Sequence, residues 1–517
     1  MTRLPRPAGG WPLGIELTVA LAAGALHALP FALTRLGWLQ MACVAVLAWR
    51  VGAAGGPWRA ALLGGAFSTA WLVGSVWWLF ISMHRYGGLP AWMAALAVLA
   101  LCAFLALYLA AALAAWVRWR PGRPAGDALL FAALWLLAEL ARGLVFTGFP
   151  WAAAGYAHVD GPLAGLAAWV GVYGIGAVSA GVAALVAGAV DAAGRARWAA
   201  MAAALLLWFA PLALPQRFTD PAGTLSVALI QGNVPQNEKF VTELQPEALG
   251  WALRQMVDAR AQLVVAPETV IPLLPSQLPD GLWEQLRAAF ADAGRAALIG
   301  VPLGDPATGY TNSAAGLSRE SAALTGGHYR YDKHHLVPFG EFIPWGFRWF
   351  VAMMDIPLGD FNRGPPAAPS FETQGQRIGP NICYEDLFGE ELAARFADPA
   401  RAPTVLANLS NIAWFGDTVA ISQHLQISRM RAIELQRPMI RATNTGATAL
   451  IDHHGRVVRA LAPHTRGVLE GEVEGRQGNT PYADWAGRLG LGPAIGLALA
   501  VVVAAAAWRR RRALAAA

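Results

Sequence analysis

The sequence is poor in cysteine and in charged residues. Its 517 residues include three cysteines, and two of them, Cys43 and Cys102, lie inside long apolar runs. This number and placement exclude a disulfide framework of the kind that stabilises small secreted domains. Only 14% of the residues are charged and 56% are hydrophobic, whereas about 25% of the residues of an ordinary soluble domain are charged. The composition therefore indicates a membrane protein that carries a more polar domain.

The sequence also lacks a dense basic patch, an internal repeat and a long low-complexity linker. The formal net charge is +6, but the basic residues are scattered or stand beside apolar runs. A nucleic-acid-binding surface would gather them on one face. We therefore expect no nucleic-acid partner, and we interpret the basic residues as signals of membrane topology.

Long apolar stretches are what the sequence has in abundance. A membrane-spanning helix needs roughly 20 mainly apolar residues, and eight stretches approach this length. They are 17–34, 36–49, 60–84, 91–117, 128–146, 161–190, 198–216 and 489–508. Inside the fifth stretch we expect Glu139 to pair with Arg142, three residues further along the same helical face. Glu16 stands at the end of a stretch, where we expect water to solvate it. The pattern predicts a bundle of eight transmembrane helices.

The distribution of arginine predicts the orientation of this bundle. With the N-terminus inside, the inner segments hold thirteen arginines and the outer ones hold three, Arg35, Arg85 and Arg142. The excess of positive charge marks the cytoplasmic side. Both termini are then cytoplasmic, and the polar segment lies outside, in the periplasm of a bacterium with an outer membrane. The predicted division is a seven-helix bundle at 1–221, an outer domain at 222–475, and a last helix with a basic tail at 476–517.

The sequence pattern of the outer segment is typical of an α/β domain. Short apolar runs predict buried strands at 226–231, 261–268, 296–303, 377–385, 403–410 and 447–452. Two amphipathic segments, 283–294 and 422–436, predict helices between them. Alternation of strands and helices favours an α/β architecture.

Three stretches at predicted strand ends carry reactive side chains. They are VVAPET with Glu268, YDKHHLVPFGEF with Lys333 and Glu341, and NICYED with Cys383. A carboxylate can remove the proton of a thiol, whose ordinary pKa near 8.5 leaves little thiolate at neutral pH, and an ammonium can stabilise an oxyanion. Such a set is sufficient for acyl transfer. Taken singly, each residue also has an ordinary structural explanation, such as a small core cysteine or an ion-paired glutamate.

In their order along the chain and in their local sequence, these three stretches resemble the Glu-Lys-Cys signature of the nitrilase, or carbon-nitrogen hydrolase, superfamily. The helical frame, the FTGFPW stretch at 146–151 and AWFGD at 413–417 narrow the resemblance to the apolipoprotein N-acyltransferase family. The resemblance implies a nitrilase-like αββα sandwich on the periplasmic face of the inner membrane. It also implies transfer of an acyl chain from a phospholipid, typically phosphatidylethanolamine, to the N-terminal amine of a diacylglyceryl-cysteine apolipoprotein. A thioester on Cys383 would carry the acyl chain in a ping-pong cycle.

The resemblance also assigns roles to residues. It makes Glu268 the general base, Lys333 the oxyanion stabiliser and Cys383 the nucleophile. Supporting or substrate-handling positions are Glu341, Tyr384, Glu385, Asn312, Trp414, Phe415 and Phe240. Two positions depart from the pattern: Phe240 stands where tryptophan is expected, and Ile412 stands where aspartate is expected.

Other functions fit parts of the pattern. A membrane-tethered amidohydrolase of the nitrilase type would use the same three residues. A transporter would use the helices alone, although, apart from Glu139 and Arg142, the stretches lack the paired intramembrane charges and broken helices expected of a transport pathway. The histidine pairs 334–335 and 453–454 lack the spacing of a metal site, so we expect neither metal nor cofactor, and we expect a monomer. The aromatic segment 342–361 is either a loop that dips into the lipid headgroups or an ordinary core helix.

Overall fold

The computed structural model describes residues 11–241, 243–353 and 360–515, and these form two compact units. The first unit comprises Met1–Trp77, Trp92–Gln216 and Leu491–Ala517. The second comprises Trp78–Ala91 and Arg217–Gly490. A short piece of chain between two apolar helices thus belongs to the polar unit.

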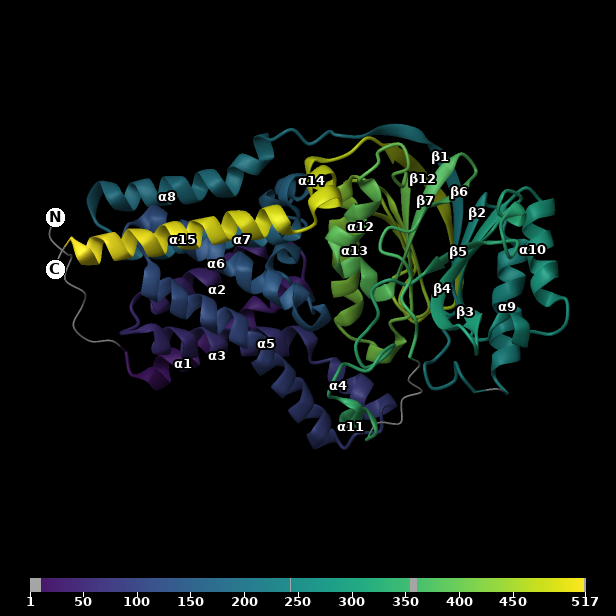
Figure 1. Cartoon of the computed structure of the whole chain (residues 1–517), viewed down its shortest axis with the longest axis horizontal. Helices are drawn as coiled ribbons and strands as arrows, with labels where there is room; N and C mark the ends of the chain where they lie inside the picture. Colours follow the sequence, from purple (N-terminus) through teal and green to yellow (C-terminus); the bar gives the residue numbers. More distant parts are fainter. Residues whose placement is uncertain (1–10, 242, 354–359, 516–517) are drawn as a thin grey trace. The chain divides into compact units, whose positions relative to one another are not determined.

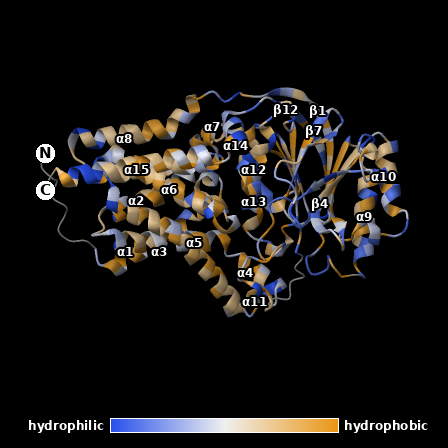
Figure 2. Cartoon of the chain, in the orientation of Figure 1, coloured by the Kyte–Doolittle hydropathy of each residue, from blue (hydrophilic) through white to orange (hydrophobic). Residues whose placement is uncertain are grey.

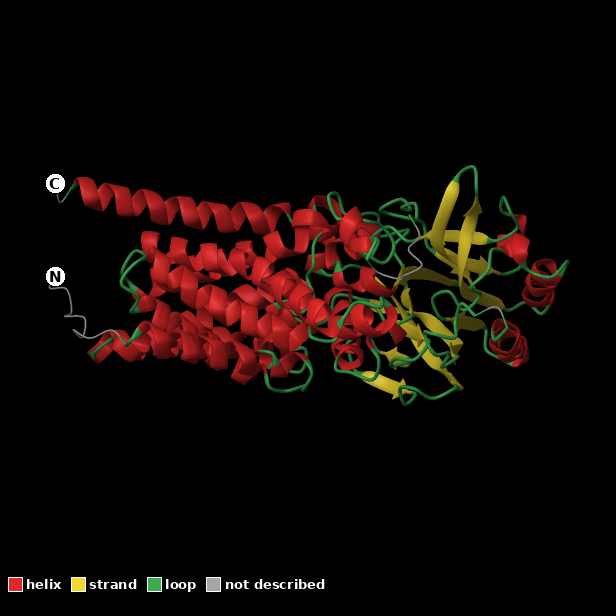
Figure 3. Ribbon diagram, turned by 90° about the horizontal axis from the view of Figure 1, so that it is seen from below, coloured by secondary structure: helices red, strands yellow, loops and turns green. Residues whose placement is uncertain are grey.

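The first unit is built from long apolar helices (Figures 2 and 3). Its helices are α1 Leu13–His27, α2 Gly37–Gly52, α3 Pro57–Val76, α5 Ala91–Trp119, α6 Pro124–Leu144, α7 Ala167–Asp191, α8 Gly194–Phe209 and α15 Gly492–Leu514. Small residues let the helices approach closely, as in membrane bundles generally. At Gly24 of α1, for example, a Cβ atom would lie 2.1 Å from the carbonyl oxygen of Phe67 in α3.

The length of these helices supports six or seven membrane spans in the described part of the chain. Six helices are long and apolar enough to cross a membrane. A seventh span results if α3 is joined to the segment Leu79–Tyr86, from which it is bent by 62°. The remaining predicted stretch is α2, a shorter apolar helix of 16 residues. Each predicted stretch therefore contains a helix, while the number of eight spans stays a prediction.

The two glutamates predicted within or beside the spans behave differently. Glu139 pairs with Arg142 at 3.4 Å, which confirms the prediction. The expectation that water solvates Glu16 is wrong, because this side chain is only 1% exposed. It forms ion pairs with Arg50 from α2 and, at 2.6 Å, with Arg59 from α3. Two arginines that converge on one carboxylate replace the water it would otherwise need.

The second unit contains two six-stranded sheets (Figure 1). The first has the order β12-β1-β2-β3-β4-β5, with β1 Asp220–Gln231, β2 Leu263–Ala266, β3 Ala296–Asp305, β4 Gly309–Leu317, β5 Tyr329–Asp332 and β12 Gly467–Gln477. The second has the order β11-β10-β9-β8-β7-β6, with β6 Phe371–Thr373, β7 Gln376–Ile382, β8 Val405–Ser410, β9 Met439–Thr443, β10 Ala449–Ile451 and β11 Val457–Ala460. Strands β1, β2 and β3 are parallel, and so are β7, β8 and β9.

The sheets pack face to face and helices cover their outer faces. Successive side chains of a strand point to opposite faces, so Val227 and Leu229 of β1 enter the core between the sheets, where Ile378 and Ile440 also lie. The intervening Ile230 faces outward, against α9 Gln245–Asp258 and α10 Leu282–Asp292. Helices α12 Gly389–Ala393, α13 Ala420–Leu435 and α14 Pro481–Leu489 lie on the other outer face. This is the predicted αββα sandwich, and all six predicted strands and both predicted helices of this segment are present.

The aromatic segment 342–361 is not an ordinary core helix in its described part. It contains one short helix, α11 Arg348–Val351, and the side chain of Trp345 is 98% exposed. Trp349 is also exposed. Residues 354–359 lie outside the described residues. The side chains of Trp345 and Trp349 are therefore available to an apolar surface.

Candidate active site

Four strand ends bring the reactive side chains together. Glu268 follows β2, Lys333 follows β5, Cys383 follows β7, and Asn411 follows β8. Carboxyl ends of neighbouring parallel strands meet at one edge of a sheet, where α/β proteins commonly bind ligands. The two sheets of the sandwich each supply two of these positions.

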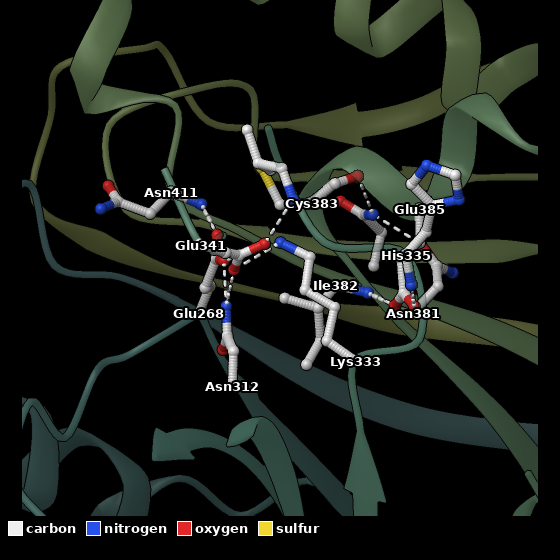
Figure 4. Close-up of polar contacts among 12 residues, drawn as sticks. Glu268, Asn312, Lys333, His335, Glu341, Asn381, Ile382, Cys383, Glu385 and Asn411 are labelled. Carbon is white, nitrogen blue, oxygen red and sulfur yellow. Dashed lines mark hydrogen bonds and ion pairs between the residues drawn. The ribbon is translucent and has the colours of Figure 1, made fainter. Parts of the chain in front are cut away.

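Glu268, Lys333, Glu341 and Asn312 form one hydrogen-bonded cluster (Figure 4). The Lys333 Nζ donates to Glu341 Oε1 at 2.9 Å and to Glu268 Oε1 at 3.4 Å. Asn312 Nδ2 donates to the same two oxygens, at 2.6 Å to Glu341 and at 2.8 Å to Glu268. The cluster thus pairs one ammonium with two carboxylates, and an amide bridges them.

The charges of this cluster are stabilised mutually. Burial of Lys333 opposes its charge, but the Glu341 and Glu268 carboxylates dominate and raise the pKa of this lysine above its ordinary value. Lys333 therefore stays positively charged at any physiological pH. A permanent, buried cation beside a thiol can stabilise negative charge on a reacting oxygen.

The Cys383 thiol lies within the electrostatic influence of this cluster. Burial, followed by the charge of Glu268, raises the pKa of Cys383 to about 12, while the charge of Lys333 acts in the opposite direction. At neutral pH the resting group is consequently a thiol rather than a thiolate. A base must remove its proton as it attacks, and Glu268 is the carboxylate with the largest effect on the thiol.

The backbone at Cys383 is strained. Its φ angle is +52°, in the left-handed region that non-glycine residues rarely adopt. Its carbonyl oxygen accepts hydrogen bonds from Asn408 Nδ2 at 3.3 Å and from His424 Nε2 at 3.2 Å. Such a conformation persists where the surroundings hold it in place, and it occurs frequently at active sites.

A buried charge network lies under the nucleophile. Arg441 Nη2 donates to His424 Nδ1 at 2.7 Å, so His424 carries its proton on Nε2. This one N–H is shared between Asp386 Oδ1 at 2.8 Å and the Cys383 carbonyl oxygen at 3.2 Å. Although burial opposes its charge, His424 and Arg441 hold the pKa of Asp386 below its ordinary value. The network connects α13 and β9 to the loop that follows Cys383.

Glu385 joins the lysine loop to the cysteine loop. Its Oε1 accepts from the main-chain nitrogens of His334 at 2.7 Å and His335 at 3.2 Å. Its Oε2 accepts from the Ile382 nitrogen and the Tyr331 hydroxyl, both at 2.7 Å. One buried carboxylate thus fixes the chain immediately after Lys333 and immediately before Cys383. The neighbouring Tyr384 is buried, and its ring packs edge to face against Phe388.

The predicted aromatic positions make ring contacts or are exposed, and none of them is hydrogen-bonded to the polar cluster in the described structure. The Trp414 ring packs against Tyr86 and the Phe415 ring against Trp78, which is 4.2 Å away between ring centroids. These partners belong to the segment Trp78–Ala91 of the same unit. Phe240 is about half exposed.

The two departures from the family pattern cause no visible disruption. Ile412 is buried and precedes the short helix Ala413–Phe415. Its methyl groups face Gly446, where a Cβ atom would lie 2.7 Å from Ile412 Cγ2. An apolar side chain therefore fits this buried position. An aspartate here would place a charge out of contact with water.

Several residues of the site were not predicted. The Asn411 main-chain nitrogen donates to Glu268 Oε2 at 2.9 Å, and the Lys239 Nζ donates to the Glu268 main-chain oxygen at 3.0 Å. A main-chain donor has no signature in a sequence. Among the residues that the structure describes, no group of three or more His, Cys, Asp or Glu side chains is arranged to hold a metal ion.

Comparison with known proteins gives matches along most of the chain. Residues 23–185 match the family model described as the apolipoprotein N-acyltransferase N-terminal domain, and residues 189–482 match the carbon-nitrogen hydrolase model.

Curated relatives match over nearly their full lengths. The chain is 56% identical to an apolipoprotein N-acyltransferase of Verminephrobacter eiseniae (strain EF01-2), covering 94% of each protein. It is 48% identical to one of Ralstonia nicotianae, covering 95% of this chain and 93% of that protein. Among solved structures, a carbon-nitrogen hydrolase of Helicobacter pylori G27 matches 52% of this chain and 93% of its own, with 15% identity and a TM-score of 0.35.

Proposed function

The chain belongs to the apolipoprotein N-acyltransferase family, and from this premise we propose that Cys383 carries the acyl chain as a thioester between two half-reactions. As a member of this family, the protein is an enzyme that acylates the N-terminal amine of apolipoproteins. The acyl donor is a phospholipid, typically phosphatidylethanolamine, and the acceptor is a diacylglyceryl-cysteine apolipoprotein. The observation that supports the roles of individual residues is the buried cluster of Glu268, Lys333 and Glu341 beside the Cys383 thiol.

In the first half-reaction the thiol attacks an ester carbonyl of the phospholipid. Glu268 accepts the thiol proton as sulfur bonds to the carbonyl carbon, and the positive charge of Lys333 stabilises the resulting oxyanion. The bond between that carbon and the glycerol oxygen then breaks, and the proton held by Glu268 passes to this oxygen. A lysophospholipid leaves, and the acyl chain remains on sulfur.

In the second half-reaction the acceptor amine attacks the thioester. Its ordinary pKa is near 8, so a neutral fraction is available at neutral pH. Glu268 accepts a proton from the attacking nitrogen, the carbon–sulfur bond breaks, and the sulfur regains a proton from Glu268. The products are an amide and the free thiol, and the balance requires no cofactor.

The supporting residues hold Glu268 and Lys333 in the positions that these proton transfers require. Glu341 and Asn312 fix the positions of Lys333 and Glu268 through the bonds to their shared oxygens. Glu385 fixes the two loops, and the adjacent Tyr384 packs behind them. For the aromatic residues Trp414, Phe415 and Phe240 we propose a role in contacting acyl chains.

A membrane location follows from the substrates. Extraction of an acyl chain from lipid costs roughly 0.8 kcal/mol per CH₂ group, so a thiol held at the membrane surface avoids a prohibitive barrier. We propose eight spans in the inner membrane, cytoplasmic termini, a periplasmic domain at 222–475 between bundle segments 1–221 and 476–517, and a monomer. The exposed Trp345 and Trp349 would then enter the headgroup region.

Mass spectrometry of the purified full chain tests this proposal. After incubation with a phospholipid of one defined acyl chain, the peptide that contains Cys383 should gain the mass of one acyl group, and hydroxylamine should remove it. Cys383→Ser should abolish turnover. Release of free fatty acid with no acylated peptide would favour the amidohydrolase alternative, and cellular function retained by Cys383→Ala would favour a transporter.

A further inference from the structure

Lysine is almost absent from this protein, and both lysines lie in the same site. The chain contains 37 arginines and two lysines, Lys239 and Lys333. Both lysine side chains are buried: Lys333 is 0% exposed and Lys239 is 6% exposed. Apart from histidine, every other basic side chain is an arginine, whose guanidinium is always charged and is planar and broad. Lysine differs because its ammonium is compact and can lose its proton when buried. Lys239 thus places a compact ammonium, which can lose its proton, in the same buried site as Lys333.

Lys239 contacts the proposed general base directly. Its Nζ donates to the main-chain oxygen of Glu268 at 3.0 Å. The next residue, Thr269, has a φ angle of +51°, so the backbone turns through a strained conformation immediately after the base. A bond to the Glu268 carbonyl holds the peptide from which this strained turn begins. Without it, the Glu268 carboxylate would lose part of its fixed orientation toward Lys333 and Asn312.

The loop that carries Lys239 supplies a second polar contact to the same region. Gln236, three residues earlier and also buried, accepts a hydrogen bond through Oε1 from Asn411 Nδ2 at 2.9 Å. The Asn411 main-chain nitrogen in turn donates to Glu268 Oε2 at 2.9 Å. The loop therefore reaches Glu268 by two routes, one to its main chain and one toward its carboxylate.

The charge of Lys239 also acts on the nucleophile. Burial lowers the pKa of Lys239 to about 8, and the charge of Glu268, together with that of Cys383 when its thiol ionises, opposes this decrease. Glu238, Glu247 and Arg466 line the same cavity as Lys239. Lys333 and Glu341 lie on the carboxylate side of Glu268. Lys239 is therefore a second buried cation of this site, bonded to the main chain of Glu268, and in contrast to Lys333 it can lose its charge in a mildly alkaline medium.

We propose that Lys239 is a positioning residue for acyl transfer, which anchors the main chain of Glu268 and adds a positive charge that favours ionisation of Cys383. This inference rests on the proposed roles of Glu268 and Cys383. The amine acts through these two residues and forms no bond to the substrate. Its contribution is present while it is protonated and declines as the pH rises through about 8.

The charge state of Lys239 can be measured directly because the chain has two lysines. Full-length protein in detergent, produced with ¹³Cε-labelled lysine, should give two lysine signals, which Lys239→Arg assigns. The signal of Lys239 should titrate near pH 8, and that of Lys333 should not titrate up to pH 10. A Lys239 signal that stays in its charged position up to pH 10 would overturn the proposed loss of charge.

Alkylation of Cys383 by iodoacetamide, followed by peptide mass, measures thiol ionisation without any acyl substrate. Lys239→Met should slow alkylation about twofold or more at pH 7, because a positive charge that couples to the thiol is removed, and the two proteins should converge above pH 9. Lys239→Arg should restore most of the rate and show no such convergence. The variant Arg260→Met, which removes an exposed cation from the same unit, is the matched control and should leave the profile unchanged.

The outcomes separate this inference from the proposed function. If folded Lys239→Met and wild-type protein give superimposable alkylation profiles, the inference is wrong, whatever the acylation result. If the alkylation profiles differ as expected but wild-type Cys383 is never acylated by phospholipid, the proposed function is wrong and the local role of Lys239 stands. Unchanged melting temperatures of the variants exclude unfolding as the cause, and Lys239→Gln replaces Lys239→Met if that variant fails to fold.

Discussion

Replacement of Glu385 by glutamine tests whether the lysine and cysteine loops are held by one carboxylate. Glu385 accepts four hydrogen bonds, three of them from the main-chain nitrogens of His334, His335 and Ile382. Each oxygen of Glu385 accepts from two donors. Glutamine has one acceptor oxygen and one NH₂ group, so its NH₂ group must face two of these four donors. The better orientation keeps the oxygen on His334 and His335, because the Tyr331 hydroxyl can rotate and accept, but it leaves the Ile382 N–H without an acceptor.

The magnitude follows from these contacts. One buried donor without an acceptor costs about 1–3 kcal/mol, and hydrogen bonds to a neutral oxygen are weaker than those to a carboxylate by roughly 1 kcal/mol each. We therefore expect Glu385→Gln to destabilise the second unit by about 2–5 kcal/mol. For a unit of this size the melting temperature should fall by roughly 5–15 °C.

Catalysis should suffer more than stability. Lys333 precedes His334 and Cys383 follows Ile382, so a shift of either loop separates the oxyanion stabiliser from the nucleophile. A misplacement near 1 Å costs about 100-fold in rate. The assay is acylation of Cys383 by phospholipid, followed by mass, together with thermal unfolding in detergent.

The matched control is Glu320→Gln, which makes the same chemical change at an exposed position of the same unit. It should alter neither quantity. If Glu385→Gln melted within about 2 °C of the wild type and acylated Cys383 at a similar rate, Glu385 would not hold the lysine and cysteine loops in place, and the reasoning would be refuted.

Further substitutions test other contacts. Asn312→Ala should slow acylation by about 10- to 100-fold, because the Glu268 and Glu341 carboxylates then lose one of their two shared donors. A rate within twofold of the wild type would contradict this role of Asn312. Asp386→Asn should destabilise the second unit by about 3–5 kcal/mol at pH 7, as expected when a buried ion pair loses one partner. Because folding lowers the pKa of Asp386, this carboxylate stabilises the wild-type fold fully above its unfolded pKa of about 4. Its stabilisation is lost as the pH falls through the lower pKa of the folded state. Thermal melts of Asp386→Asn should therefore not show this loss of stability in acid. Finally, lipids with quenchers in the bilayer should quench wild-type fluorescence more than that of a Trp345→Phe, Trp349→Phe double variant, and equal quenching would rule out entry of the loop into the membrane.

Much of the fold was predictable because it depends on local apolar patterns. The strands predicted from their apolar runs, such as β2 and β8, are buried on both faces. Strand β4 was missed because its sequence GYTNSAAGL is rich in small and polar residues, which local patterns assign to loops. Strand β12 alternates valine and leucine with glutamate and glycine, and its pairing with β1 at the end of the sheet is a long-range contact. Glu16 was misjudged for the same reason, since its two arginine partners come from other helices.

The candidate site was predictable as a set of residue types and not as a geometry. The motifs identified Glu268, Lys333 and Cys383, and the contacts now place the first two in one hydrogen-bonded cluster beside the thiol. The left-handed backbone of Cys383 and the donor from the Asn411 main chain are properties of the folded chain. Lys239 is the exception, because the scarcity of lysine in the printed sequence already distinguishes it.

The central claim is that the acyl chain on Cys383 is transferred to an amine. It is tested most directly by a single-turnover chase, in which protein acylated on Cys383 is freed of phospholipid and mixed with a diacylglyceryl-cysteine peptide. The account predicts that Cys383 loses the acyl mass at the rate at which the peptide amine gains it, in equal amounts. Loss of the acyl group as free fatty acid, or an acylated peptide formed while Cys383 remains acylated, would contradict it.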